Sequence, residues 1–118
     1  MKLSANLGLL WSELPLLERV YKAKEKNFDA VEFQFPYEVD ANKLKKAIDK
    51  INLPIIGINT IKGDVSKGDN GLNAIPSKVQ EARVAIDQAI EYAKVIGSKN
   101  IHFMCGITEQ NHNSLKTL

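Results

Sequence analysis

The chain alternates between short apolar runs of strand length and longer runs of helix length, and this alternation limits the possible folds more than any other feature. Helix-forming residues separate each apolar run from the next, and a further helix-like stretch begins at Ser114. Strictly alternating units of this kind place the strands parallel in one sheet, with helical crossovers between them. The runs of strand length are residues 2–7, 30–35, 55–59 and 100–105.

Three complete helices are expected between the strands. The first falls within residues 13–27, and the second begins after Asp40, a residue that is favoured at helix N-caps. The third is expected over residues 77–96, because Ser77 and Gln80 have the spacing of a capping box and an apolar face recurs at helical spacing after them. The expected fold class is therefore α/β.

Parallel strand–helix units can form an open doubly wound sheet, a closed (β/α)8 barrel, or part of such a barrel. A full barrel takes about 250 residues, and this chain of 118 residues is about half of one. The length fits one domain, residues 1–118, but does not decide between an open sheet and part of a barrel.

Composition excludes several functions. Sixteen basic and fourteen acidic side chains leave a formal charge of +2, which predicts no concentrated basic surface for nucleic acid. No run approaches the roughly 18 apolar residues that a membrane span requires. Ser4, Asn6 and Glu13 interrupt the apolar N-terminal stretch, which argues against a secretory signal. The lone Cys105 cannot form an intramolecular disulfide, so a reducing cytoplasm is the expected location.

A long polar loop, residues 60–76, follows the third strand. Its glycines have the spacing of a phosphate-binding loop, but Asp69 and Asn70 stand where that motif requires Lys and Ser or Thr. Nucleotide binding is therefore not expected. Connections of this kind usually take about 2 to 6 residues, so the extra length indicates either a functional loop or a polar flap that tolerates insertions.

Polar residues in or near the strands are candidate binding groups. Glu32 has apolar neighbours in a strand expected to be largely buried, so its carboxylate needs either a structural partner or a function. Asn6 and Asn59 near the ends of two strands each offer a donor and an acceptor to a polyol. His102 and His112 have no recognised metal-ligand spacing, and structural roles are expected for both.

Four segments resemble the N-terminal half of the hydroxypyruvate isomerases, within the xylose-isomerase-like barrel superfamily of sugar isomerases and epimerases. They follow one another in the order of the family and span nearly the whole chain. The segments are SANLGLLW, AVEFQFPYEVD, GINTIKGDVSKGDNGLNAIP and EYAKVIGSKNIHFMCG. The most specific points are Ser4 to Leu7, Val31 to Phe33, Phe35 to Tyr37, Gly63 and Asp64 with Gly71, and Ile75 with Pro76.

The resemblance implies half of a TIM (β/α)8 barrel. It also implies an isomerase that interconverts hydroxypyruvate and tartronate semialdehyde, or related hydroxy-carbonyl compounds, through an enediol. In that family the catalytic glutamates and the ligands of a divalent metal come from later strands. No catalytic or metal-binding residue is therefore expected in this chain, which alone should be inactive. The substrate-pocket candidates are Asn6, Glu32, Phe35, Tyr37, Asn59, Gly63 and Asp64.

A half barrel has two unpaired strand edges and an inner face without an opposite wall, and both favour association. The expected partner is a second copy, with the fourth strand of each chain beside the first strand of the other. Two functions of different classes remain open. The chain is either the leading half of an isomerase that handles a small-molecule substrate, or a non-catalytic half barrel that binds a ligand or partner.

Overall fold

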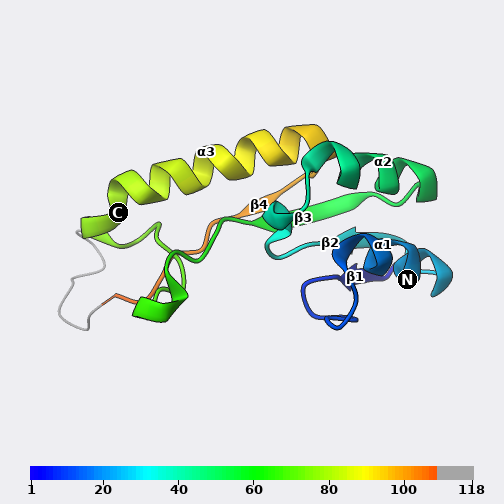
Figure 1. The fold of residues 1–118 in the computed structure, drawn as a ribbon, viewed down its shortest axis with the longest axis horizontal. Helices are drawn as coiled ribbons and strands as arrows, with labels where there is room; N and C mark the ends of the chain where they lie inside the picture. The colour runs from blue at the N-terminus through cyan, green and yellow to red at the C-terminus, as the bar shows by residue number, and fades with distance from the viewer. Residues whose placement is uncertain (109–118) are drawn as a thin grey trace.

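The computed structural model describes residues 1–108, in which four parallel strands form one sheet in chain order (Figure 1). The strands are β1 (Ser4–Asn6), β2 (Ala30–Glu32), β3 (Ile55–Asn59) and β4 (Ile101–His102). Doubly wound sheets reverse their strand order at a switch point, and this order β1-β2-β3-β4 has no reversal. The topology is therefore that of consecutive units of a barrel.

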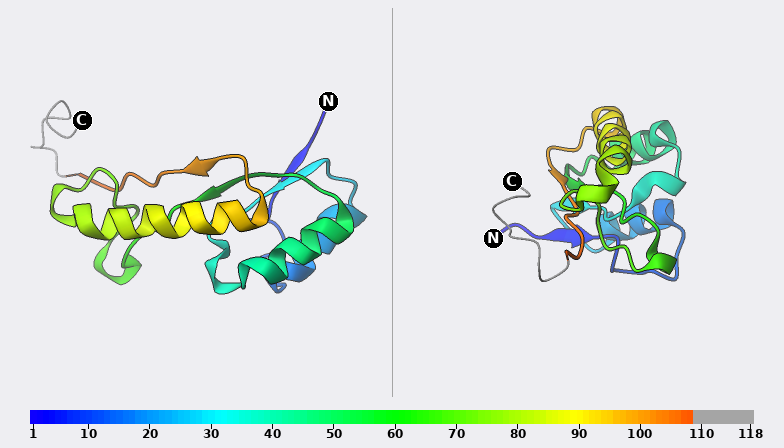
Figure 2. Two further views of the ribbon diagram at one scale, coloured as in Figure 1. Left: turned by 90° about the horizontal axis from the view of Figure 1, so that it is seen from above. Right: turned by 90° about the vertical axis from the view of Figure 1, so that its left-hand side faces the viewer.

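Three helices lie on one side of the sheet (Figures 1 and 2). Within residues 1–108, no helix covers the opposite, inner face of the sheet. Helices outside and strands inside are the arrangement of a (β/α)8 barrel, so the expectation of half a TIM barrel is confirmed. The helices are α1 (Leu16–Glu25), α2 (Ala41–Ile51) and α3 (Val79–Ile96), and short 3-10 turns occur at η1 (Pro36–Glu38), η2 (Val65–Lys67) and η3 (Pro76–Lys78).

The hydrophobic core fills the layer between the sheet and the helices. Val31 and Phe33 from the β2 segment are buried there, against a cluster that includes Val20 of α1 and Leu44 of α2. Because side chains alternate across a strand, Glu32 between them and Gln34 after them face the inner side. The burial of alternate residues therefore fixes which face of the sheet remains polar.

The helix ends test two expectations about capping. Asp40 is the N-cap of α2 as expected, and its carboxylate accepts a hydrogen bond of 3.0 Å from the backbone N–H of Lys43. The prediction of a capping box at Ser77 and Gln80 is wrong, because α3 begins at Val79 and its N-cap residue makes no side-chain hydrogen bond to the helix. Pro76 starts a 3-10 turn instead, since its fixed φ suits the first position of a helical turn.

Three strands are shorter than expected, although their hydrogen bonding continues beyond the strand ends. The N–H of Leu7 donates to the carbonyl oxygen of Glu32 at 2.8 Å, and that of Phe33 donates to Gly57 at 3.0 Å. The register shifts between Val31 and Glu32, which interrupts a regular ladder. In the runs expected at 2–7, 30–35 and 100–105, only the central or first residues are therefore regular strand.

Two expectations concern the chain outside this sheet. The helix expected to begin at Ser114 lies outside the described residues, as does His112. None of the helices within residues 1–108 combines the length and the apolar character that crossing a bilayer requires.

Candidate functional site

A hollow of about 660 Å³ lies on the inner face of the sheet. Asn6 of β1, Glu32 of β2 and Asn59 of β3 all contribute to its wall, so the structure brings together three residues that the sequence singled out. The interior of such a barrel is normally filled by bulky branched side chains. Amide and carboxylate groups at the carboxyl ends of adjacent strands instead provide hydrogen-bonding groups for a polar ligand.

The strand register explains why these side chains meet. Asn6 lies opposite Glu32 in the pairing of β1 with β2, and Asn59 lies opposite His102 in the pairing of β3 with β4. Each of these residues is the last of its strand. In the pairing of β2 with β3, Glu32 lies opposite Gly57, so the side chains form two neighbouring levels, Asn6 with Glu32 and Asn59 with His102, at the carboxyl edge of the inner face.

Gln34, Asn100 and Met104 also line the hollow, although none of them was among the predicted site residues. His102 was assigned a structural role, but it is exposed and its ring makes no hydrogen bond to other residues within 1–108. It is therefore available to a ligand. Alternation could have identified Gln34, since it lies two residues after Glu32; His102 required the pairing with β3, which sequence alone does not give.

Tyr37 does not line the hollow, but it contacts Asn59, which does. Its hydroxyl donates a hydrogen bond to the backbone carbonyl oxygen of Asn59, and its ring packs edge-on against Tyr92 of α3, with 5.2 Å between ring centroids. Burial raises the pKa of Tyr37 to about 12, so the hydroxyl remains a donor at physiological pH. Tyr37 thus positions the end of β3.

Tyr92 connects the same turn to α3. Its hydroxyl lies 2.9 Å from the carbonyl oxygen of Pro36 and 2.7 Å from that of Val39, at the two ends of the η1 segment. Burial, with smaller contributions from nearby acidic groups, raises the pKa of Tyr92 to about 12. The two tyrosines together fix the β2–α2 connection against both β3 and α3.

Phe35 lines a second, smaller cavity of about 130 Å³ between the loops that follow β1 and β2. Arg19 lines the same cavity and organises the first of these loops. Its guanidinium donates to the carbonyl oxygens of Leu7 and Ser12, each at 2.9 Å, and of Leu14 at 2.7 Å. Three bonds from one rigid planar group hold the loop after β1 in a single conformation.

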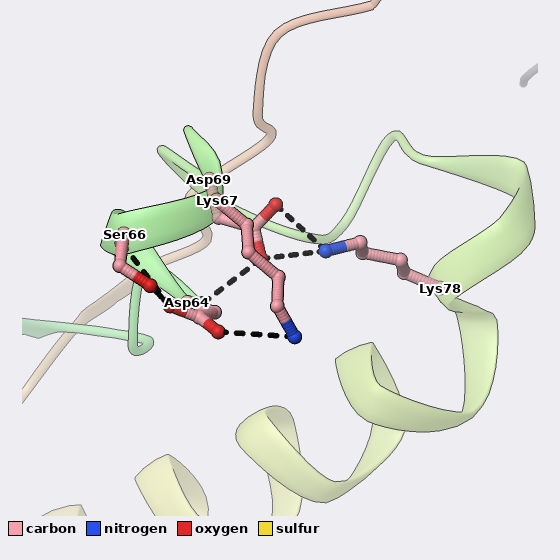
Figure 3. A network of polar contacts seen from close by, with 5 residues as sticks. All are labelled: Asp64, Ser66, Lys67, Asp69 and Lys78. Carbon is pink, nitrogen blue, oxygen red and sulfur yellow. Dashed lines mark hydrogen bonds and ion pairs between the residues drawn. The ribbon is translucent and has the colours of Figure 1, made fainter.

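Gly63 and Asp64 do not line the hollow, but lie in the loop after β3, which is at the far end of the molecule from β1 (Figure 1). The loop is braced internally (Figure 3). Asp64 accepts a 3.1 Å bond from the backbone N–H of Ser66, and Asp69 accepts one of 2.9 Å from the N–H of Asp64. The loop thus has an ordered structure of its own.

An ion pair fixes this loop to the start of α3. The ammonium of Lys78 lies 2.6 and 2.7 Å from the two carboxylate oxygens of Asp69, and the side chains are only 24% and 13% exposed. The hydrogen bond from Lys78 lowers the pKa of Asp69, and the same bond raises the pKa of Lys78. The stabilising effect of the Asp69–Lys78 ion pair is therefore lost in acid, as Asp69 is protonated, and in strong base, as Lys78 loses its proton.

A second anchor ties the loop to the segment after β4. Thr60 is fully buried, and its hydroxyl oxygen accepts hydrogen bonds from the N–H of Met104 at 2.9 Å and from the side-chain amide of Asn73 at 3.3 Å. Next to it, Gly71 forms an isolated antiparallel bridge with Cys105. The long loop is therefore anchored at two places, at Thr60 and at Asp69, although none of its residues lines the hollow.

The described part of the chain does not itself offer a metal site. No group of three or more His, Cys, Asp or Glu side chains gathers within residues 1–108 in a way that could hold a metal ion. Glu32 and His102 are the residues of these types that line the hollow. Two potential ligands are fewer than the usual requirement of a structural or catalytic metal.

Parallel strands in chain order, helices on the outer side and polar groups at the carboxyl ends are the arrangement of half a (β/α)8 barrel. The xylose isomerase-like TIM barrel family profile matches residues 20–117. The chain belongs to this family.

Named relatives agree with this assignment. The chain is 38% identical over 109 residues to a 2-oxo-tetronate isomerase of Haemophilus influenzae, which covers 92% of this chain and 42% of the relative. It is 35% identical over 114 residues to the hydroxypyruvate isomerase of Escherichia coli, covering 97% and 44% of the two chains. The crystal structure of a family 2 AP endonuclease from Brucella melitensis superposes with a TM-score of 0.86 at 38% identity, over 93% of this chain and 43% of that one.

The chain spans less than half the length of these relatives. The part that is matched is the leading half of the barrel, as the resemblance in the sequence implied. The hollow on the inner face is therefore one side of the space that a complete barrel encloses.

Two glycines of the long loop allow a matched test of its second anchor. A Cβ at Gly71 would overlap the carbonyl group of Met104, whereas a Cβ at Gly68 would meet nothing within 4 Å. Both have positive φ, +119° and +86°. We expect Gly71→Ala to lower the free energy of unfolding by about 3 kcal/mol or more, and Gly68→Ala by about 1 kcal/mol. Equal decreases in the free energy of unfolding, measured by urea denaturation, would show that the close contact of Gly71 with Met104 and Cys105 does not hold the loop.

Proposed function

We propose that this chain supplies the leading half of an isomerase that moves a proton between adjacent carbons of a small hydroxy-carbonyl compound through an enediol. The observation that carries the proposal is that Asn6, Glu32 and Asn59 line one hollow on the inner face, in a family whose relatives include hydroxypyruvate and 2-oxo-tetronate isomerases. Their amide and carboxylate groups bind and orient the hydroxyl and carbonyl oxygens of the substrate.

The proton transfer itself is assigned to residues outside the described part. An enediol mechanism needs a base to remove a proton from the carbon beside the carbonyl group and an acid to return one to the neighbouring carbon. Glu32 is the only carboxylate that lines the hollow within residues 1–108, and no metal-binding group gathers there. We therefore assign the paired acids and any divalent metal to the later strands of the barrel. The single, exposed Cys105 fits a reducing compartment such as the cytoplasm.

The test adds hydroxypyruvate to the 118-residue chain and measures its binding and its turnover in separate experiments. Binding should shift the side-chain amide signals of Asn6 and Asn59 in a ¹H–¹⁵N NMR spectrum, and Asn59→Ala should weaken binding about tenfold. The chain alone should produce no tartronate semialdehyde in a coupled assay. Asn52→Ala, outside the hollow, is the control and should leave binding unchanged.

Two results would contradict this assignment. Absence of any shift at Asn6 and Asn59 would remove the binding role of the inner face. Turnover by the chain alone that disappears in Glu32→Gln would make Glu32 a catalytic residue rather than a group that orients the substrate. Binding without turnover in any assembled form would favour the alternative function, a non-catalytic binding module.

We further propose that the 118-residue polypeptide, when produced alone, forms a symmetric dimer. Within residues 1–108, the outer edges of β1 and β4 pair with no other strand. In a parallel strand alternate residues bond to opposite neighbours, and the carbonyls of Asn100 and His102 already accept bonds from the N–H groups of Ile58 in β3 and of Thr60 directly after it. Ile101 and Phe103 therefore direct their backbone groups to the free edge, where β1 of a second copy can pair.

Light scattering coupled to size exclusion measures this association. The wild-type chain should elute with the mass of a dimer, and Phe103→Pro should shift it toward a monomer, because proline removes a backbone donor from the free edge. Phe103→Ala is the control, since it retains the donor and should remain dimeric. A monomeric wild type, or equal effects of both substitutions, would contradict pairing through β4.

A further inference from the structure

Gly8, in the loop after β1, contacts two polar side chains of the hollow. Its backbone N–H donates a 3.0 Å hydrogen bond to the side-chain oxygen of Asn6. A Cβ atom at Gly8 would lie only 2.4 Å from Cγ of Gln34 and 2.8 Å from Cβ and Cδ of the same side chain. Asn6 and Gln34 both line the hollow. A residue without a side chain is therefore placed where it affects two of the amides that face a ligand.

The bond from Gly8 determines which end of the Asn6 amide is left for a ligand. A backbone N–H can only donate, so the atom that it meets is the amide oxygen. The NH2 group at the other end makes no hydrogen bond to any other residue within 1–108. Asn6 therefore offers its NH2 donors to the hollow, while the loop after β1 engages its oxygen.

Hydrogen bonds on both sides of Gly8 hold its backbone in place. The carbonyl oxygen of Leu7 accepts a bond of 2.9 Å from the guanidinium of Arg19, and the N–H of Leu10 donates one of 2.9 Å to the carbonyl oxygen of Asn6. Gly8 does not have a positive φ, so a left-handed backbone is not the reason for a glycine here. A larger residue at this position would therefore displace the facing side chain rather than the loop.

Gln34 combines a fixed backbone with an amide that no neighbour engages. Its carbonyl oxygen accepts a 3.0 Å hydrogen bond from the N–H of Asn59, which ties its main chain to the end of β3. Its side chain is partly buried, lines both the hollow and the smaller cavity, and makes no hydrogen bond to other residues within 1–108. A partly buried amide requires a hydrogen-bonding partner, and a polar ligand in the hollow can supply one.

We propose that Gln34 is a further substrate-binding residue of the hollow, and that Gly8 is the positioning residue that leaves room for its side chain. The amides of Asn6 and Gln34 bind neighbouring oxygen atoms of the substrate, Asn6 as a donor and Gln34 as a donor or an acceptor. The inference rests on the proposed function and adds to it one binding residue and the glycine through which that residue is positioned.

The positioning role is tested without any ligand, from the side-chain amide signals of Gln34 in a ¹H–¹⁵N NMR spectrum of the 118-residue chain. Gly8→Ala should shift these signals, because its methyl group takes the place of the Gln34 side chain. Gly68→Ala is the matched control, since its methyl group meets nothing within 4 Å, and it should leave them unchanged. Gln34 signals that Gly8→Ala does not move would overturn the positioning role of Gly8.

The binding role is tested by NMR titration of the same variants with hydroxypyruvate. Gln34→Gly removes all three of the atoms closest to a Cβ at Gly8, and it should weaken binding about fivefold through the loss of one hydrogen bond. Gly8→Ala should weaken binding by a similar factor. Gly8→Ala added to Gln34→Gly should weaken it no further, because no side chain is left to displace.

Two titration results would overturn the inference while the proposed function stands. Hydroxypyruvate binding that Gln34→Gly does not alter would remove the binding role of Gln34. An effect of Gly8→Ala that persists in full beside Gln34→Gly would show that Gly8 does not act through Gln34. If the wild-type chain does not bind hydroxypyruvate, the proposed function fails together with the binding role of Gln34, and the ligand-free spectra still decide whether Gly8 positions this side chain.

Discussion

The two-sidedness of each strand in a parallel sheet determines most of this structure. Side chains alternate between the faces, and the helices of the described chain cover only one of them. Val31 and Phe33 are buried under the helices, so Glu32 and Gln34 must face the other way. The same pattern that builds the core therefore presents polar groups to the barrel interior, and a register slip of one residue would reverse both.

The loops at the carboxyl edge add fixed geometry to this polar face. Arg19 holds the loop after β1 through three carbonyl oxygens, and Tyr37 holds the end of β3 through the carbonyl of Asn59. Thr60 and the Asp69–Lys78 pair hold the long loop after β3 at both ends. Groups that are fixed before a ligand binds lose less entropy on binding, so Asn59, whose carbonyl oxygen Tyr37 holds, is a preorganised part of the wall of the hollow.

Local patterns in the sequence were sufficient to predict the order of elements, the N-cap at Asp40 and the polar residues Asn6, Glu32 and Asn59 at strand ends. Predictions that depended on distant partners were weaker. The capping box at Ser77 was wrong, because Pro76 starts a 3-10 turn ahead of α3. The availability of His102 depends on its pairing beside Asn59, which lies 43 positions away in the chain.

The contacts made by loops were the least predictable part of the site. The residues of the Gly8–Gln34 contact lie 26 positions apart, and those of the Thr60–Met104 bond 44 apart. No spacing rule for helices or strands links such positions, since they meet only once the sheet has formed. The resemblance to a family implied that Gly63 and Asp64 belong to the substrate pocket; they lie in the braced loop and do not line the hollow of residues 1–108, and their contact with a substrate stays a prediction.

The pairing of the strands is the central claim, and interstrand backbone NOEs measured by NMR on the 118-residue chain test it most directly. Parallel order β1-β2-β3-β4 predicts contacts between Ala5 and Val31 and between Ile58 and Ile101, with the same directional pattern in every pair. Contacts with the alternation typical of antiparallel strands, or contacts between β1 and β3, would contradict both the half barrel and the polar inner face derived from it.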